Sequence, residues 1–97
     1  MAIDLEAGRT LLYTAARKAA AGKLTSSDAS IAKVYVNEMA QRVTNAAMQV
    51  CGAYGLSNEF PFERYYRDVR GFAIGYGTTE IHRNTIAREM ITGRYQP

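Results

Sequence analysis

Apolar residues recur every three or four positions along most of the chain, which is the spacing of amphipathic helices. The clearest such stretch begins after Thr25 and ends near Gly52. Ala, Leu and Arg, which favour helix, fill an earlier segment from about Ile3 to Ala21. We therefore predict two long antiparallel helices. The apolar stripe of the second contains Ala32, Tyr35, Val36, Met39, Val43, Ala46, Ala47 and Val50.

Residues that stop or cap helices divide the rest of the chain. Gly22 ends the first helix, and the polar residues 25–28 offer N-caps for the second. After the second helix comes a glycine-bearing loop. Pro61 then suits the first turn of a third, shorter helix, because its fixed φ matches and its missing N–H is not needed there.

A fourth helix is expected near the C-terminus. The chain is broken first by Gly71, Gly75 and Gly77. Thr78 or Thr79 can then cap a helix that ends at Gly93, which leaves residues 94–97 as a frayed tail. No repeat or convincing strand is present.

The predicted fold class is all-α, an antiparallel helical bundle. Its stripes are rich in Ala, so helices can approach closely but bury little area. A chain of 97 residues with such stripes is marginal alone, which favours a component of a larger bundle or an oligomer.

Composition narrows the function classes. Cys51 is the only cysteine and His82 the only histidine. An internal disulfide is therefore excluded, and the sequence predicts no metal site. A single thiol fits a reducing compartment, the bacterial cytoplasm or the mitochondrial matrix. No apolar run reaches membrane-spanning length. The net charge of +3 is scattered rather than massed, so we expect no nucleic-acid partner, although a basic helical nucleic-acid binder stays open as a remote alternative.

Two turns carry a family resemblance. The stretch QVCGAYGLSNEFPFERYYRDVR is similar to the signature of the acyl-CoA dehydrogenase family, and IGYGTTEIHRNTIAREMI resembles that family's flavin- and substrate-contacting turn and last helix. The two segments that precede them match the family's preceding helices in order and spacing. Ala53 departs from the signature, which usually has Gly there. The signature positions are Gln49, Gly52, Ala53, Gly55, Glu59, Arg64 and Asp68.

The resemblance implies that residues 1–97 are part of the family's C-terminal helical domain, without the first helix of its bundle and without the two domains before it. The complete protein would use FAD to oxidise an acyl-CoA thioester across Cα–Cβ. Electrons would pass to an electron-transfer flavoprotein, and the protein would be a homo-oligomer (dimer or tetramer) or a heteromer. This chain alone would be inactive. The alternative is a non-catalytic helical oligomerisation module or a degenerate partner subunit.

The resemblance also implies site residues. It places five residues against the FAD of a neighbouring subunit, at its pyrophosphate and adenosine portion: Gln49, Val50, Cys51, Gly52 and Ala53. It places three more against FAD at a helix N-terminus, which suits an anionic cofactor: Thr78, Thr79 and Glu80. Gly77 would contact the acyl-CoA.

Tyr76 stands where much of the family has the Glu that removes the α-proton. A Tyr, with a reference pKa near 10, is a poor base at neutral pH, so we expect Tyr76 to shape the pocket wall. No catalytic residue is assigned. His82 is expected on a helix surface or interface. Ion pairs are expected at Glu63–Arg67 and Arg64–Asp68.

Overall fold

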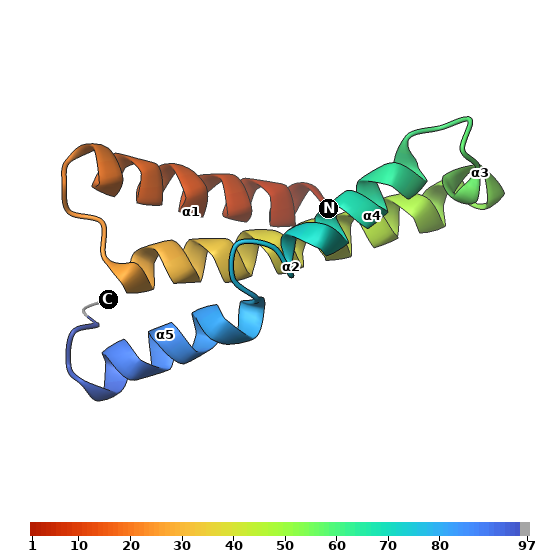
Figure 1. The fold of residues 1–97 in the computed structure, drawn as a ribbon. Coiled ribbons are helices and arrows are strands. Elements are labelled where there is room, and N and C mark those ends of the chain that lie inside the picture. The colour runs from red at the N-terminus through yellow and green to blue at the C-terminus, as the bar shows by residue number, and fades with distance from the viewer. Residues whose placement is uncertain (96–97) are drawn as a thin grey trace.

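The computed structural model describes residues 1–95, and its regular structure there is entirely helical (Figure 1). The helices are α1 (Ala2–Ala20), α2 (Ser26–Cys51), α3 (Ala53–Leu56), α4 (Phe62–Phe72) and α5 (Thr79–Ile91). The predicted all-α class is confirmed. Of the predicted frayed tail, Gln96 and Pro97 lie outside the described residues.

Helix α2 is the axis of the molecule. In Figure 1, α1 runs back along one side of the N-terminal half of α2, α5 lies along another side of that half, and α4 lies along the C-terminal half. Over residues 1–95, α1, α4 and α5 each pack on α2 and not on one another. The result is an elongated body of 49 × 23 × 19 Å.

Side-chain caps fix the starts of α2 and α5. Thr25 and Asp28 form a capping box: the Asp28 amide donates to Thr25 Oγ1, and the Thr25 amide donates to Asp28 Oδ2, each at 3.1 Å. The Ile81 amide donates to Thr78 Oγ1 at 3.3 Å. Both N-caps come from the segments that the sequence marked for them.

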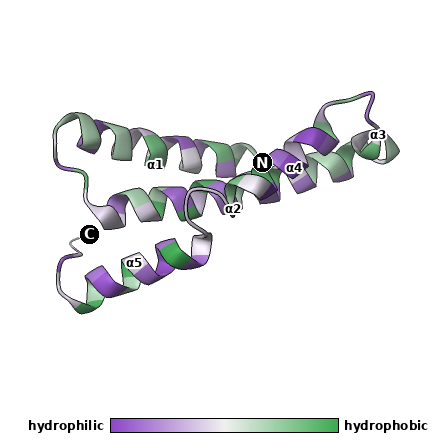
Figure 2. Ribbon diagram, in the orientation of Figure 1, coloured by the Kyte–Doolittle hydropathy of each residue, from purple (hydrophilic) through white to green (hydrophobic). Residues whose placement is uncertain are grey.

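The apolar core is very small. Only Ala32, Met39 and Ala73 are buried apolar residues among those described, and no large side chain is fully buried. Gly8 on α1 is buried against Met39, where a Cβ would lie 2.5 Å from Met39 Cε. Large apolar side chains such as Leu12 and Leu56 are instead exposed, and Figure 2 shows apolar stretches along α1 and in α3. Helix packing here therefore buries mainly small residues.

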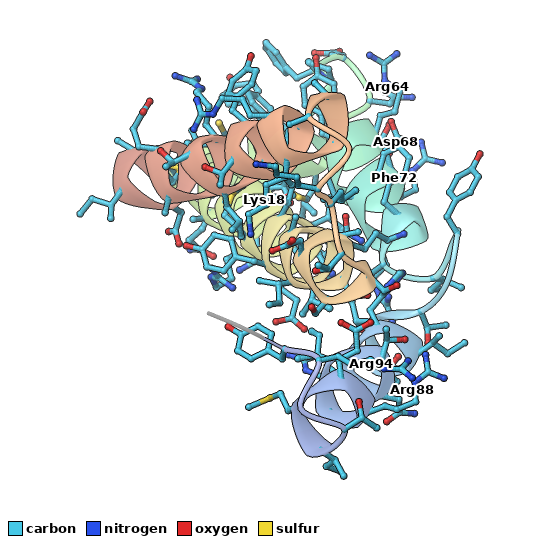
Figure 3. All side chains as sticks on the ribbon, turned by 90° about the vertical axis from the view of Figure 1, so that its left-hand side faces the viewer. Lys18, Arg64, Asp68, Phe72, Arg88 and Arg94 are labelled. Carbon is cyan, nitrogen blue, oxygen red and sulfur yellow. The ribbon has the colours of Figure 1, made fainter. Side chains whose placement is uncertain are left out.

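Three local details differ from the sequence prediction. The glycine-bearing loop contains the short helix α3. Helix α4 begins after Pro61, which is its N-cap, and continues through Gly71 to Phe72, so the break comes later than expected. The Glu63–Arg67 pair forms at 2.8 Å, but the Arg64–Asp68 pair is not among the ion pairs of residues 1–95. Arg64 lies over the Tyr65 ring at 5.6 Å instead, on the outer side of α4 (Figure 3).

We predict that Asp28 makes stability depend on pH. The Lys18 ammonium donates to Asp28 Oδ1 at 2.6 Å, and this bond, helped by Thr25, lowers the pKa of the Asp28 carboxyl. Its contribution is present above the unfolded pKa of about 3.9 and is lost as pH falls through the lower folded value. The free energy of unfolding of Asp28→Asn, measured with urea, should differ from that of wild type near neutral pH. This difference should shrink as the solution is acidified.

Thr25→Ala is the control. It removes the cap oxygen and should cost about 1 kcal/mol of unfolding free energy, while leaving the Lys18–Asp28 bond and most of the pH dependence. If the difference in unfolding free energy between Asp28→Asn and wild type stays constant from neutral to acidic pH, the prediction is contradicted.

Candidate functional sites at two turns

The residues expected to contact a cofactor lie in two places on this chain. Gln49 to Ala53 form the far end of α2 and the start of α3, whereas Gly77 to Glu80 lead into α5. Lys33 Nζ donates to Gly75 O at 2.6 Å, so the second turn lies beside Lys33. Thr78, Thr79 and Glu80 share a cleft with Gln41, which at about 1.5 Å per residue lies about 12 Å from Gln49 along the axis of α2. The two segments therefore form separate sites.

Gly52 shapes the first site. It ends α2 with φ 57°, and its amide donates to Gln49 O at 3.3 Å. Ala53 follows as the first residue of α3 and has a negative φ, so a methyl group in place of a hydrogen causes no backbone strain there. The departure from the family signature at Ala53 is therefore tolerated by the fold.

The first site contains a cleft of about 480 Å³ without a charged side chain in its lining. Asn45 and Gln49, four residues apart on α2, provide amide groups, and apolar and aromatic side chains complete the walls. Val50 is 79% exposed, and Cys51 is a half-buried free thiol. The lining residues are Asn45, Met48, Gln49, Gly52, Leu56 and Tyr66.

The second site begins with a left-handed turn. Tyr76 has φ 57° and Gly77 has φ 90°, and the Tyr76 side chain is 93% exposed. His82 Nε2 lies 3.3 Å from Tyr76 O. His82, half-buried on α5, thus contacts this turn, a contact that the sequence did not indicate. Neither His82 nor Lys33 carried a sequence signal for this role.

Two of the first amides of α5 are already occupied. The Thr79 amide donates to Ala73 O at 3.3 Å, and the Ile81 amide donates to Thr78 Oγ1. The Glu80 backbone amide, with the Thr78 hydroxyl, holds the pKa of the Glu80 carboxyl below its ordinary value. Two of the first three amides of α5, those of Thr79 and Ile81, therefore already donate hydrogen bonds within the chain.

A cleft of about 290 Å³ adjoins this helix start. It is polar, and it contains hydroxyl, carboxylate and guanidinium groups. Glu38 in its wall is paired with Arg83 at 2.7 Å. The lining residues are Glu38, Gln41, Arg70, Ala73, Ile74, Thr78, Thr79 and Glu80.

Residues 1–95 contain no cluster of three or more His, Cys, Asp or Glu side chains suited to hold a metal ion. No helix in the same range has the length and hydropathy needed to cross a bilayer.

Residues 1–91 match the model of a family described as "Acyl-CoA dehydrogenase, C-terminal domain". The chain belongs to the acyl-CoA dehydrogenase family. It is 38% identical over 91 residues to a probable short/branched chain specific acyl-CoA dehydrogenase of Dictyostelium discoideum, covering 94% of this chain and 22% of that protein. It is 43% identical over 93 residues to a short-chain specific acyl-CoA dehydrogenase of Megasphaera elsdenii, and the match covers 96% of this chain and 23% of that protein.

Solved structures share the fold. Butyryl-CoA dehydrogenase from Megasphaera elsdenii superposes with a TM-score of 0.90 at 38% identity, over 94% of this chain and 24% of that chain. A chain from a study of the electron transferring flavoprotein of Acidaminococcus fermentans superposes with a TM-score of 0.89 at 36% identity. This match covers 94% of this chain and 24% of that chain. The chain thus spans about a quarter of the length of these relatives.

We predict that Gly55→Ala destabilises the first site. Gly55 is buried, and a Cβ there would lie 2.7 Å from Met48 O, a backbone atom that cannot turn aside. The cost should be about 1–3 kcal/mol of unfolding free energy, as for overpacking elsewhere, measured by urea unfolding.

Gly71→Ala is the matched control within a helix. A Cβ at Gly71 meets nothing within 4 Å, so the same substitution should stabilise α4 by about 0.5–1 kcal/mol. Equal effects of the two substitutions would show that the contact between Gly55 and Met48 does not constrain the turn.

Proposed function

We propose that residues 1–97 form part of the C-terminal helical domain of an FAD-dependent acyl-CoA dehydrogenase, to which they contribute flavin contacts and a subunit interface. The complete protein would oxidise an acyl-CoA thioester across Cα–Cβ. The observation that carries this proposal is the family match over residues 1–91, which includes both turns. The mitochondrial relatives from Bos taurus and Rattus norvegicus support the mitochondrial matrix, and the bacterial relatives support the bacterial cytoplasm.

The two turns open into different clefts, one at the end of α2 and one at the start of α5. Gln41, in the second cleft, lies about 12 Å along α2 from Gln49, so the two sets of residues are separate on this chain. In our proposal, Gln49, Val50, Cys51, Gly52 and Ala53 serve the FAD of a neighbouring subunit. Thr78, Thr79 and Glu80 serve the other FAD.

The chemistry of the linings fits different portions of FAD. The uncharged first cleft has the amides of Asn45 and Gln49 beside the Tyr66 ring, which suits the adenosine end better than a phosphate. The second cleft offers the hydroxyls of Thr78 and Thr79, which suit the hydroxyl-rich part of the cofactor. When bound, FAD supplies the hydride acceptor, and this chain's residues orient it.

The acyl-CoA would approach at Gly77 and Tyr76. Tyr76 is highly exposed and would form part of the pocket wall. A carboxylate base is absent from this position, so we place the base outside residues 1–97 and infer that this chain alone is inactive. An electron-transfer flavoprotein would accept the electrons, a proposal supported by the flavoprotein study among the structural neighbours. The same Tyr76 favours a second candidate, a non-catalytic partner subunit.

We predict that Gly52→Val lowers FAD retention in the protein that carries this chain. Val adds a β-branched side chain at φ 57°, a conformation that such residues rarely adopt. The ratio of flavin to protein absorbance after gel filtration should fall at least about threefold, whereas Ala53→Gly, its neighbour in the same turn, should stay near wild type. Equal ratios for Gly52→Val and wild type, with the fold intact, would remove this turn from the cofactor site.

Absence of flavin reduction by any acyl-CoA in the wild-type protein would favour the second candidate function, the non-catalytic partner subunit.

We further predict that the chain self-associates. It exposes 6882 Å², whereas a compact monomer of its mass exposes about 5,500 Å². The excess of about 1,400 Å² exceeds the roughly 800 Å² that each partner buries in a standard interface. Sedimentation at micromolar concentration should show dimers or larger species. A monomer with a cooperative thermal transition would contradict this interface.

A further inference from the structure

The turn before α5 holds two consecutive residues in left-handed backbone conformations. Gly77 adopts φ 90° readily because it has no Cβ, but Tyr76 at φ 57° is strained. Non-glycine residues keep such conformations only where their surroundings hold them in place. The contacts of this turn therefore identify the residues that position it.

Two side chains bind successive carbonyl groups of the turn. Lys33, from α2, donates to Gly75 O at 2.6 Å, and its ammonium lies 5.8 Å from the centre of the Tyr76 ring. His82, from the first turns of α5, lies with Nε2 3.3 Å from Tyr76 O. The carbonyls on both sides of the Tyr76 Cα are thus held from two different helices.

The contacts of His82 determine where its proton resides. A carbonyl oxygen only accepts hydrogen bonds, so Nε2 must carry the proton that it donates to Tyr76 O. In the neutral ring Nδ1 is then an acceptor. Ser30 Oγ lies 3.1 Å from Nδ1, and Ser30 is only 4% exposed. The buried hydroxyl of Ser30 therefore donates to Nδ1.

The imidazole also fills the space that a side chain at Gly77 would need. A Cβ built at Gly77 would lie 2.9 Å from His82 Nε2. The ring thus packs against the turn while it binds its carbonyl, and the fit requires glycine at position 77 in addition to its positive φ.

We propose that His82 is a positioning residue whose ring is oriented by Ser30. His82 holds the Tyr76 carbonyl and so fixes the Tyr76 side chain and Gly77 at the substrate edge of the site. This role rests on the proposed function for its effect on acyl-CoA, but the hydrogen bond itself does not. Lys33 holds the preceding carbonyl, so loss of His82 alone frees only the second half of the turn.

The first test is the protonation of the ring. His82 is the only histidine of the chain, so a long-range ¹H–¹⁵N spectrum of the uniformly labelled protein reports it without ambiguity in the 97-residue chain. In alkaline solution we expect the Nε2–H form of the ring to predominate. A ring protonated at Nδ1 cannot donate to Tyr76 O and would overturn the proposal.

The second test uses three variants. The Gly77 amide nitrogen shares a peptide group with Tyr76 O, so its ¹⁵N shift reports on that hydrogen bond. We expect His82→Leu to move this shift, and His82→Gln, which keeps a side-chain N–H, to restore most of it. Asn84→Leu, an exposed change of the same kind two residues later, should leave it unchanged. An unmoved Gly77 signal in His82→Leu would refute the contact.

The third test is kinetic and uses the flavin-loaded protein that carries this chain. His82→Leu should lower the rate constant for flavin reduction by butyryl-CoA at least about tenfold, as expected for a misplaced wall of the site, with FAD content unchanged and His82→Gln near wild type. A normal rate in His82→Leu would overturn the positioning role. A wild-type protein that binds no FAD would refute the proposed function, and the ring protonation would still decide whether His82 holds the turn.

Discussion

Helix α2 makes every contact between helices in residues 1–95, apart from that of α3 with α4. This is possible because the buried positions of α2 are small: Ser27, Ser30 and Ala32 let neighbouring helices approach its backbone closely. Such packing buries little apolar area, and Met39 against Gly8 is the main exception. The position of α2 therefore fixes the architecture, while many large apolar side chains stay exposed on this chain.

One polar side of α2 organises the second site. Ser30, Lys33 and Asn37 recur at three- and four-residue steps and reach His82, Gly75 O and Phe72 O respectively. The Asn37 amide donates to Phe72 O at 2.9 Å at the end of α4. A row of side chains on one helix thus holds the end of α4, the left-handed turn and the start of α5 in register. The geometry of the site is built into α2 rather than into the turn alone.

The long helices and their caps could be predicted because their signals are local. Periodic apolar residues define α2, and the hydroxyls of Thr25 and Thr78 cap helices in the structure. Helix α3 could not be predicted, because four residues that include Gly55 carry no helical signal and depend on packing against Met48.

The site residues divide in the same way. The family motif identified both turns, whose flavin and substrate roles stay proposals. The contact of His82 with Ser30 joins residues far apart in sequence, so no spacing rule could reveal it. Arg64 and Asp68 have the spacing for an ion pair, but the Tyr65 ring attracts the guanidinium. Local spacing shows which groups can meet, and tertiary packing decides which of them do.

The arrangement of α1, α4 and α5 around one shared helix has a consequence for cooperativity. Because these three helices do not contact one another, the detachment of one breaks no contact between the other two. The three helices are therefore organised as separate foldons that share α2. Each can open at a free energy below that of complete unfolding. Unfolding of α2 has a different effect, because it removes the surface against which each neighbouring helix packs. The N-terminal half of α2 contacts both α1 and α5, and it therefore couples the folding of these two helices.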